Sequence, residues 1–155
     1  MKRLGVAAAV LMTVVGCAAP VGETNLDLHQ RAQLPDGTSL ALSGFEVSAK
    51  DSGRRTGPQK VVGDEVKVGV QVANAGKVIR AADVTMRFTY TDPGGRDVTP
   101  REVSSSTNSI PQGGSDKISK TYRVAAVPEL FRAKHLRVVV EVQGYPSVTF
   151  SGRNP

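Results

Sequence analysis

The side chains that could carry out chemistry are few in this chain, and they are far apart. His29 and His135 are its only histidines. They have no His-x-x-x-His spacing and no cysteine ligands nearby, so the sequence offers few of the ligands that a zinc site requires. No Gly-x-Ser-x-Gly sequence, the turn that presents a catalytic serine in many hydrolases, occurs. We therefore expect both histidines to be surface residues of strands, and we expect no cofactor, no metal and no enzymatic activity.

Two aspartates and one basic stretch are the other candidates for a site. Asp92 and Asp97 flank a predicted hairpin turn and could bind calcium, but Arg96 lies between them and opposes cation binding. The basic stretch 53–60 is rich in glycine but has neither the Gly-Lys-Ser/Thr sequence nor the following helix of a phosphate-binding loop. It is either a solvated connection or a contact for an anionic partner. Its candidate binding residues are Arg54, Arg55 and Lys60. Residues 92–101 form the second candidate binding loop.

The only cysteine, Cys17, stands at the end of an apolar run that follows Lys2 and Arg3. A basic start, a short apolar run and small residues before a cleavage point are typical of a secretory signal peptide. The sequence Val14-Val15-Gly16-Cys17 resembles the lipobox of bacterial lipoproteins. The resemblance implies cleavage before Cys17 and the attachment of acyl chains such as palmitate to this residue. No second cysteine exists to form a disulfide, and an unmodified thiol would be a liability in an oxidising compartment.

The predicted organisation is a signal peptide over 1–16, the lipidated Cys17 with a tether over 17–25, and one folded domain over 26–155. The mature chain is long enough to bury a hydrophobic core without disulfides or metals. Loss of Lys2 and Arg3 lowers the net charge of +6 by two charges. This mild positive charge is compatible with anionic lipid or acidic polymer. Nucleic acid is a poor candidate, because no basic helix and no strand studded with aromatic residues is present.

Hydrophobic residues alternate with polar ones along most of the domain, which predicts half-buried β-strands. The clearest strands are 66–72, 84–90, 118–124, 136–142 and 148–150. Lys120 interrupts the apolar face of its strand, which predicts an edge strand. Asn74-Ala75-Gly76 and Asp92-Pro93-Gly94-Gly95 are predicted turns. The stretch 104–107 is predicted to be a flexible loop.

The N-terminal half of the domain has a less regular pattern. Leu26 and Leu28 predict a first strand, and 34–37 predicts a turn. The apolar phase shifts at Ser43-Gly44, which predicts a β-bulge. One helical turn is expected near 128–134, where Leu130 and Phe131 would close one end of the core. Together these features predict an all-β, antiparallel sandwich of two sheets with about seven strands, and a closed barrel is the alternative.

The run 66–76 looks like the "V-x-V-x-V-x-N-x-G" strand of bacterial extracellular immunoglobulin-like domains, among which those of the cell-adhesion-related type are the nearest match. The hairpin 84–97 and the segment 110–115 before the strand at 118–124 fit the same pattern. The resemblance covers about residues 60–143. It implies an immunoglobulin-like sandwich with a binding or scaffolding role, and it implies no catalytic residues.

Our leading functional hypothesis is a lipid-anchored protein of the bacterial envelope that acts as a non-enzymatic binding or scaffold module. It would attach to the membrane through Cys17 and hold an envelope protein or an acidic polymer through loops or an exposed strand edge. Ala18 and Ala19 lack the aspartate that marks inner-membrane retention in some bacteria, which favours the outer membrane or cell surface. The alternatives are an assembly factor of a secretion or pilus system and a small envelope hydrolase that uses His135.

Overall fold

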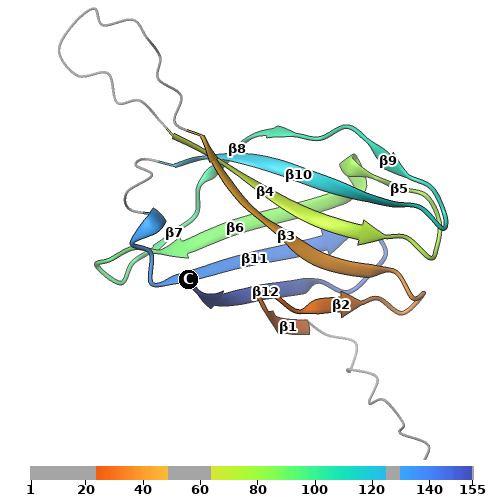
Figure 1. Cartoon of the computed structure of the whole chain (residues 1–155), viewed down its shortest axis with the longest axis horizontal. Coiled ribbons are helices and arrows are strands. Elements are labelled where there is room, and N and C mark those ends of the chain that lie inside the picture. The colour runs from red at the N-terminus through yellow and green to blue at the C-terminus, as the bar shows by residue number, and fades with distance from the viewer. Residues whose placement is uncertain (1–23, 49–63, 125–129, 155) are drawn as a thin grey trace, which may run out of the picture.

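The computed structural model of the chain describes residues 24–48, 64–124 and 130–154, and these residues form a sandwich of two five-stranded sheets (Figure 1). The first sheet has the order β1-β12-β11-β6-β7. Its strands are β1 (Thr24–Asp27), β12 (Val148–Arg153), β11 (His135–Val142), β6 (Val84–Thr91) and β7 (Asp97–Val98). The second sheet has the order β2-β3-β4-β10-β8. Its strands are β2 (Arg31–Gln33), β3 (Ser39–Ser48), β4 (Asp64–Ala73), β10 (Ser115–Val124) and β8 (Arg101–Ser105).

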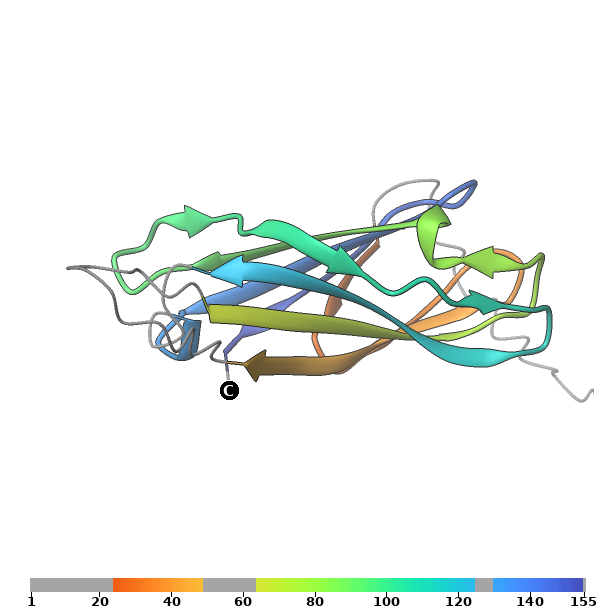
Figure 2. The same cartoon turned by 90° about the horizontal axis from the view of Figure 1, so that it is seen from above.

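A small two-stranded ladder lies apart from the two sheets. It joins β5 (Ile79–Arg80) to β9 (Ser109–Ile110), and a short 3-10 turn, η1 (Ala81–Asp83), follows β5. Figure 2 shows the two main layers from above. The all-β sandwich predicted from the sequence is therefore confirmed, and the closed barrel is excluded.

The core lies between the layers and consists of the inward residues of the alternating strands. Val66, Val68, Val70 and Val72 of β4 are all fully buried, and so is Phe88 of β6. Burial of such side chains is the main favourable term in folding, at roughly 1.5–3 kcal/mol for each fully buried one. The alternation seen in the sequence thus places one face of each long strand on a common core.

Seven strands have five or more residues, which agrees with the expected number. One pair departs from the antiparallel arrangement, because β1 runs parallel to β12 with Thr24 opposite Val148. The chain then crosses at Leu28 to the other sheet, where β2 pairs antiparallel with β3. The first strand of the domain is thus divided between the two sheets.

The phase shift in β3 is a bulge, as predicted. Its register against β4 changes between Leu42 and Gly44, and Gly44 has a φ of 124°, a conformation that favours glycine. The shift allows Leu40 and Leu42 on one side of the bulge, and Phe45 and Val47 on the other, to face the interior. The apolar phase slip in the sequence therefore has a direct structural cause.

The prediction that 118–124 is an edge strand is wrong. β10 lies between β4 and β8, and β8 includes Ser104 and Ser105, which the sequence had indicated as loop. Lys120 faces the interior next to β8, where its Nζ lies 3.0 Å from Glu102 Oε1. The lysine is tolerated because a carboxylate from the neighbouring strand pairs with it.

The prediction for the helical turn is correct in place but wrong in one detail. Leu130 and Phe131 are helical, and the start of the turn lies outside the described residues. Leu130 is buried, whereas Phe131 is 67% exposed and does not close the core. In the part of the chain that the structure describes, no helix has the length and hydrophobicity needed to cross a bilayer.

Candidate functional site: an apolar groove between the sheets

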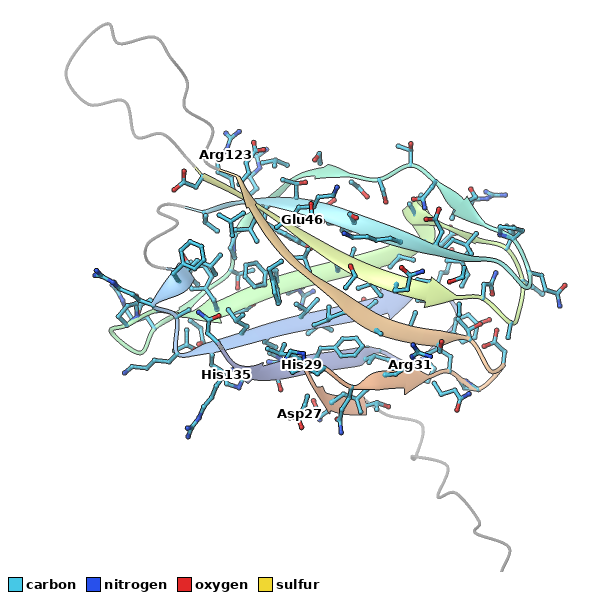
Figure 3. The ribbon with its side chains drawn as sticks, in the orientation of Figure 1. Asp27, His29, Arg31, Glu46, Arg123 and His135 are labelled. Carbon is cyan, nitrogen blue, oxygen red and sulfur yellow. The ribbon has the colours of Figure 1, made fainter. Side chains whose placement is uncertain are left out.

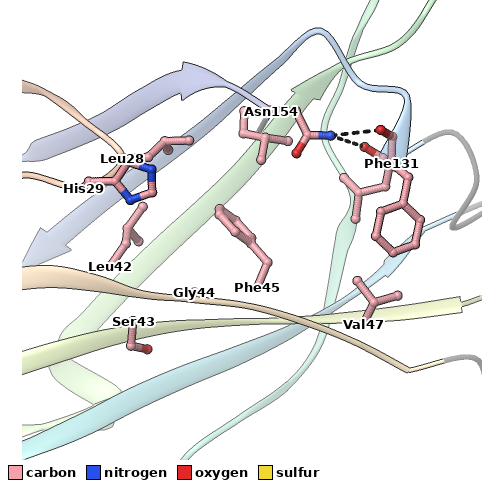
Figure 4. A pocket seen from close by; sticks show the side chains of 11 residues that line it. Leu28, His29, Leu42, Ser43, Gly44, Phe45, Val47, Phe131 and Asn154 are labelled. Atoms are coloured by element: carbon pink, nitrogen blue, oxygen red, sulfur yellow. Dashed lines mark hydrogen bonds between the residues drawn. The ribbon is translucent and has the colours of Figure 1, made fainter.

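An apolar groove opens between the two sheets on the side where β3 faces β11 and the end of β12. Its volume is about 470 Å³, within the range typical of ligand sites. Figure 4 shows Leu42, Phe45 and Val47 of β3 on one side and Leu28, Phe131 and Asn154 on the other. The remaining lining residues are His29, Ser43, Gly44, Leu130 and Leu136.

The bulge in β3 gives the groove its apolar wall. Phe45 and Val47 follow the bulge and are half-buried, and the ring of Phe45 lies 5.6 Å from that of Phe88 in the core. Leu28 packs above Gly152 of β12, where an added Cβ would lie 3.1 Å from Leu28 Cγ. The groove is therefore lined by side chains whose positions are fixed by packing against the two sheets.

One rim of the groove is a strand edge that no other strand of the described residues covers. In the part of the chain that the structure describes, β2 pairs with Ser39–Ala41 of β3, and the pairing stops at Arg31, the first residue of β2. The chain between β1 and β2 turns away from β3, with the Gln30 backbone N–H donating to Asp27 O at 3.0 Å. Among the described residues, the part of β3 from Leu42 onward is thus hydrogen-bonded to β4 alone.

Few polar groups enter the groove. Asn154 donates its side-chain amide to the backbone oxygens of Leu130 and Phe131, at 3.0 and 3.1 Å, which fixes the helical turn against the end of β12 (Figure 4). His29 is exposed in the turn after β1. The site therefore offers a hydrophobic surface and an open strand edge, and its polar groups are better placed to orient a ligand than to act on one.

The charges near the groove are mainly positive. Arg31, Arg132, Lys134 and Arg153 are exposed on segments that adjoin the lining residues. Figure 3 shows His29 and Arg31 along the same long side of the molecule. Two exposed acidic residues also adjoin the lining, Asp27 before Leu28 and Glu46 between Phe45 and Val47.

Glu46 is already engaged on the outer face of the sheet. Lys117 Nζ donates to Glu46 Oε1 at 2.8 Å, and Lys67 Nζ lies 3.9 Å from Oε2. The hydrogen bond and charge of Lys117, together with the charge of Lys67, lower the pKa of Glu46. Lys117 reaches across Gly69, where an added Cβ would overlap its side chain. The negative charge of Glu46 is thus largely offset by lysines.

The opposite end of the sandwich has a polar cluster in place of a groove, and we call it the Asn74 hub. Asn74 is only 3% exposed. Its amide donates to the oxygens of Lys77 and Ile110, at 2.8 and 2.9 Å. Its side-chain oxygen accepts from Thr38 Oγ1 at 3.3 Å and from the backbone N–H of Gly76 at 3.0 Å. The hub therefore ties three connections to the end of β4.

A hydrogen bond beside the hub joins the two sheets. Tyr145, in the turn between β11 and β12, donates its hydroxyl to Asp36 Oδ2 at 2.6 Å. Burial raises the pKa of Asp36, but the hydrogen bonds from Tyr145 and Thr38 outweigh it, so that the pKa lies below its ordinary value of 3.8. The same bond to Asp36 raises the pKa of Tyr145. A Cβ at Gly76 would overlap the carboxylate of Asp36, which explains the Asn-x-Gly sequence here.

The structure does not gather the chemically active residues predicted from the sequence. His135 lies exposed on β11, opposite Arg153 and Thr91, as a surface strand residue, whereas His29 lies in a turn. Among the described residues, no cluster of three or more histidine, cysteine, aspartate or glutamate side chains could hold a metal ion. Four of the predicted site residues lie outside the described residues: Cys17, Arg54, Arg55 and Lys60. The predicted signal peptide and the part of the tether before Thr24 lie outside them as well.

The candidate calcium site at the β6–β7 turn has a different role. The Arg96 backbone N–H donates to Asp92 Oδ1 at 2.9 Å, and Arg96 Nε donates to Oδ2 at 3.2 Å. These bonds lower the pKa of Asp92. Asp97 accepts a hydrogen bond from Thr91 Oγ1 at 2.8 Å. The two aspartates therefore stabilise the turn and do not converge on a common ligand.

The groove was missed in the sequence analysis because its residues have the pattern of ordinary core residues. Leu28, Leu42 and Phe45 have the apolar character of residues on the inward face of a strand, and nothing in that pattern distinguishes a covered core from an open one. The bulge at Ser43-Gly44 was the available indication, because bulges are frequent at sheet edges and beside functional sites.

Comparison with known proteins identifies a fold and no family. No family model matches the chain, and no curated protein does. An uncharacterised β-sandwich protein of Clostridium difficile is similar over 84% of this chain and 95% of its own length, with 11% identity and a TM-score of 0.52. A candidate lipoprotein of Bacillus subtilis is similar over 83% of this chain, with 13% identity and a TM-score of 0.51, but this chain spans only 39% of that protein.

The secreted protein MPT63 of Mycobacterium tuberculosis aligns with 84% of this chain at 11% identity and a TM-score of 0.48. At these identities the likeness to the Clostridium difficile and Bacillus subtilis proteins concerns the fold alone. The class that the architecture defines is the β-sandwich.

Proposed function

We propose that this protein is a lipid-anchored binding or scaffold module of the bacterial envelope, without enzymatic activity. The observation that carries the proposal is the apolar groove beside the open edge of β3. Its lining is mainly hydrophobic, and no nucleophile is hydrogen-bonded to a base within it among the described residues. A surface of this kind suits the retention of a partner better than the transformation of a substrate.

The anchor is the second part of the proposal. Val14-Val15-Gly16-Cys17 has the lipobox pattern, and one solved structure with a similar fold belongs to a candidate lipoprotein of Bacillus subtilis. The described sandwich begins at Thr24. Since seven extended residues span at most about 25 Å, a lipid on Cys17 would hold the domain close to the membrane. The partner would be an envelope protein or an acidic polymer, and the membrane would be the outer membrane or the cell surface.

Mass spectrometry of the mature protein tests the anchor. We expect a new N-terminus at Cys17 with two or three acyl chains, and we expect Cys17→Ser to leave the precursor unlipidated and uncut by lipoprotein signal peptidase. An unmodified thiol on the wild-type mature protein would overturn the lipoprotein proposal.

Chemical cross-linking in intact cells tests the binding role. We expect wild-type protein to capture a defined envelope component, and Phe131→Asp at the mouth of the groove to reduce its recovery. The matched control is Val78→Asp, an exposed apolar residue that is absent from the lining of the groove. Equal recovery with both variants would place the partner elsewhere, with the loop containing Arg54, Arg55 and Lys60 as the next candidate.

A further inference from the structure

We infer that the groove and the open edge of β3 together bind an extended acidic peptide segment, which adds to the second sheet as a new edge strand beside Leu42–Val47. This inference rests on the proposed binding function and specifies its partner. The chemistry is that of strand addition, in which backbone hydrogen bonds hold the partner and alternate side chains occupy pockets.

Among the residues that the structure describes, no strand other than β4 lies beside β3 from Leu42 onward. β2 occupies the edge of β3 only as far as the pair Arg31–Ala41, and the residues before Arg31 come from β1 in the other sheet. A partner strand would continue the line of β2 along the rest of β3. Backbone groups at such an edge are a ready template for pairing, and this edge is bounded on its inner side by a hydrophobic groove.

The apolar lining of the groove selects the side chains of the partner. In an added strand, alternate residues point to opposite faces of the sheet. Those facing inward would contact Leu42, Phe45 and Val47, which are only half-buried in the structure. They would also meet Leu28 and Phe131 on the other side of the groove. Apolar residues at every second position of the partner would therefore be selected.

The charged residues around the groove favour an acidic partner. Four exposed basic residues surround this side: Arg31, Arg132, Lys134 and Arg153. They outnumber the exposed Asp27, and the charge of Glu46 is offset by Lys67 and Lys117. The outward residues of the partner are therefore expected to be acidic. A second copy of this chain would bring two positive rims together, which disfavours self-association at this edge. The chain's own segment 50–60 is also basic.

The same geometry disfavours a hydrocarbon ligand. An acyl chain could occupy the apolar lining but would offer no hydrogen-bond partners to the backbone of β3. Covering unpaired N–H and C=O groups without such partners is unfavourable. The open strand edge therefore favours a peptide over a lipid chain.

The test uses the full chain with Cys17→Ser, which removes the lipidation site and leaves the sandwich unchanged. The probe is a fluorescent peptide of alternating valine and glutamate. The control peptides carry N-methyl groups on alternate backbone nitrogens, or lysine in place of glutamate. We expect saturable binding of the acidic peptide, slower amide hydrogen exchange within Leu42–Val47, and a loss of roughly tenfold or more in affinity with either control.

Two pairs of protein variants locate the site. Phe131→Ala should weaken binding by roughly tenfold, and its control Val78→Ala should not change it. Arg132→Glu should weaken binding at low salt, whereas Arg87→Glu, exposed on the outer face of β6, should have less effect. Because all four positions are exposed, matching circular dichroism melting curves are expected.

Several results would overturn strand addition. Equal binding of the N-methylated peptide would show that backbone pairing is not used. Suppose decanoate binds the groove and the peptide does not slow amide hydrogen exchange in Leu42–Val47. This result would show that the groove binds a hydrocarbon chain. Formation of dimers through β3 would assign the edge to a second copy. An unlipidated Cys17 in the native protein would overturn the anchor alone, so the failure of each proposal can be recognised separately.

Discussion

The Asn74 hub and the apolar groove lie at opposite ends of the sandwich, and they differ in how far the protein itself satisfies their side chains. At the hub, a buried asparagine forms hydrogen bonds with Thr38, Lys77 and Ile110, and the Tyr145–Asp36 bond joins the sheets beside it. In the groove, half-buried apolar side chains face a space of about 470 Å³, and the strand edge above it has no neighbour among the described residues. The polar groups of the hub form hydrogen bonds within the protein, whereas the apolar side chains of the groove remain partly exposed.

This difference separates a stabilising region from a binding region. A buried polar group is stabilising only when its partners are present, so the hub is expected to be sensitive to any loss. An open apolar surface adds little to the stability of the free protein and becomes useful when a partner covers it.

Asn74→Ala should destabilise the fold by about 3–5 kcal/mol, because it removes the hydrogen bonds that Asn74 forms with the oxygens of Lys77 and Ile110 and with the hydroxyl of Thr38. That is a large part of the roughly 5–15 kcal/mol available to a domain. Urea unfolding followed by circular dichroism measures the loss. Asn154→Ala is the matched control, because one of the two carbonyls it bonds is exposed. If Asn74→Ala lowered the free energy of unfolding no more than Asn154→Ala does, the stabilising role of the hub would be contradicted.

Phe45→Ala should destabilise the protein by about 1–2 kcal/mol, less than a fully buried phenylalanine would, because its ring is only half-buried while it contacts Phe88. Phe45→Leu should recover most of this loss. Thermal unfolding gives the comparison. A loss above about 4 kcal/mol would mean that this wall of the groove is core.

Tyr145→Phe should lower stability by less than about 1 kcal/mol at neutral pH, because Asp36 is exposed and solvent weakens the bond. The folded-state pKa of Asp36 is lowered, so its contribution is present above the ordinary value of 3.8 and is lost as the pH falls through the folded value. The pKa of Tyr145 is raised from 10.0, so its contribution is present below pH 10 and is lost as the pH rises through the folded value.

The variant should therefore reduce the pH dependence of the urea midpoint both below pH 4 and above pH 10. Tyr90→Phe is not a suitable control, because Tyr90 is buried; the exposed Asn25→Ala serves instead. Identical pH profiles for wild type and Tyr145→Phe would show that the bond between the sheets contributes nothing.

Phe131→Ala should change the free energy of unfolding by no more than about 0.5 kcal/mol, because this side chain is 67% exposed. The same variant should bind the acidic peptide roughly tenfold more weakly, so that stability and binding respond separately at this residue. Chemical denaturation provides the first quantity, and fluorescence anisotropy with the acidic peptide provides the second. A loss of stability above about 1 kcal/mol would show that Phe131 is part of the packed fold.

The sequence pattern predicted most of the sandwich because each long strand obeys one local rule. In β4, β6 and β11, apolar residues occupy every second position, and all of these residues are buried. The bulge at Ser43-Gly44 and the turns at 34–37 and 92–95 were also predictable, since each needs particular residues at fixed positions. The error at β10 has a different origin, because whether Lys120 lies at an edge depends on where β8 pairs, and β8 has no alternating pattern.

The sequence by itself determined the strands, their inward faces and the two principal turns, because these depend on residues that are adjacent in the chain. It also carries the lipobox pattern at Val14–Cys17. Only the tertiary structure decided that Asn74 is a buried hub and that Phe131 is exposed, because both depend on segments more than 20 residues away. The groove, too, was decided only by the tertiary structure. It exists because the chain pairs first with β12 as β1 and then with β3 as β2, so that β2 covers only part of the edge of β3. The position of the crossing at Leu28 depends in part on the pairing of β1 with β12, a strand at the other end of the sequence.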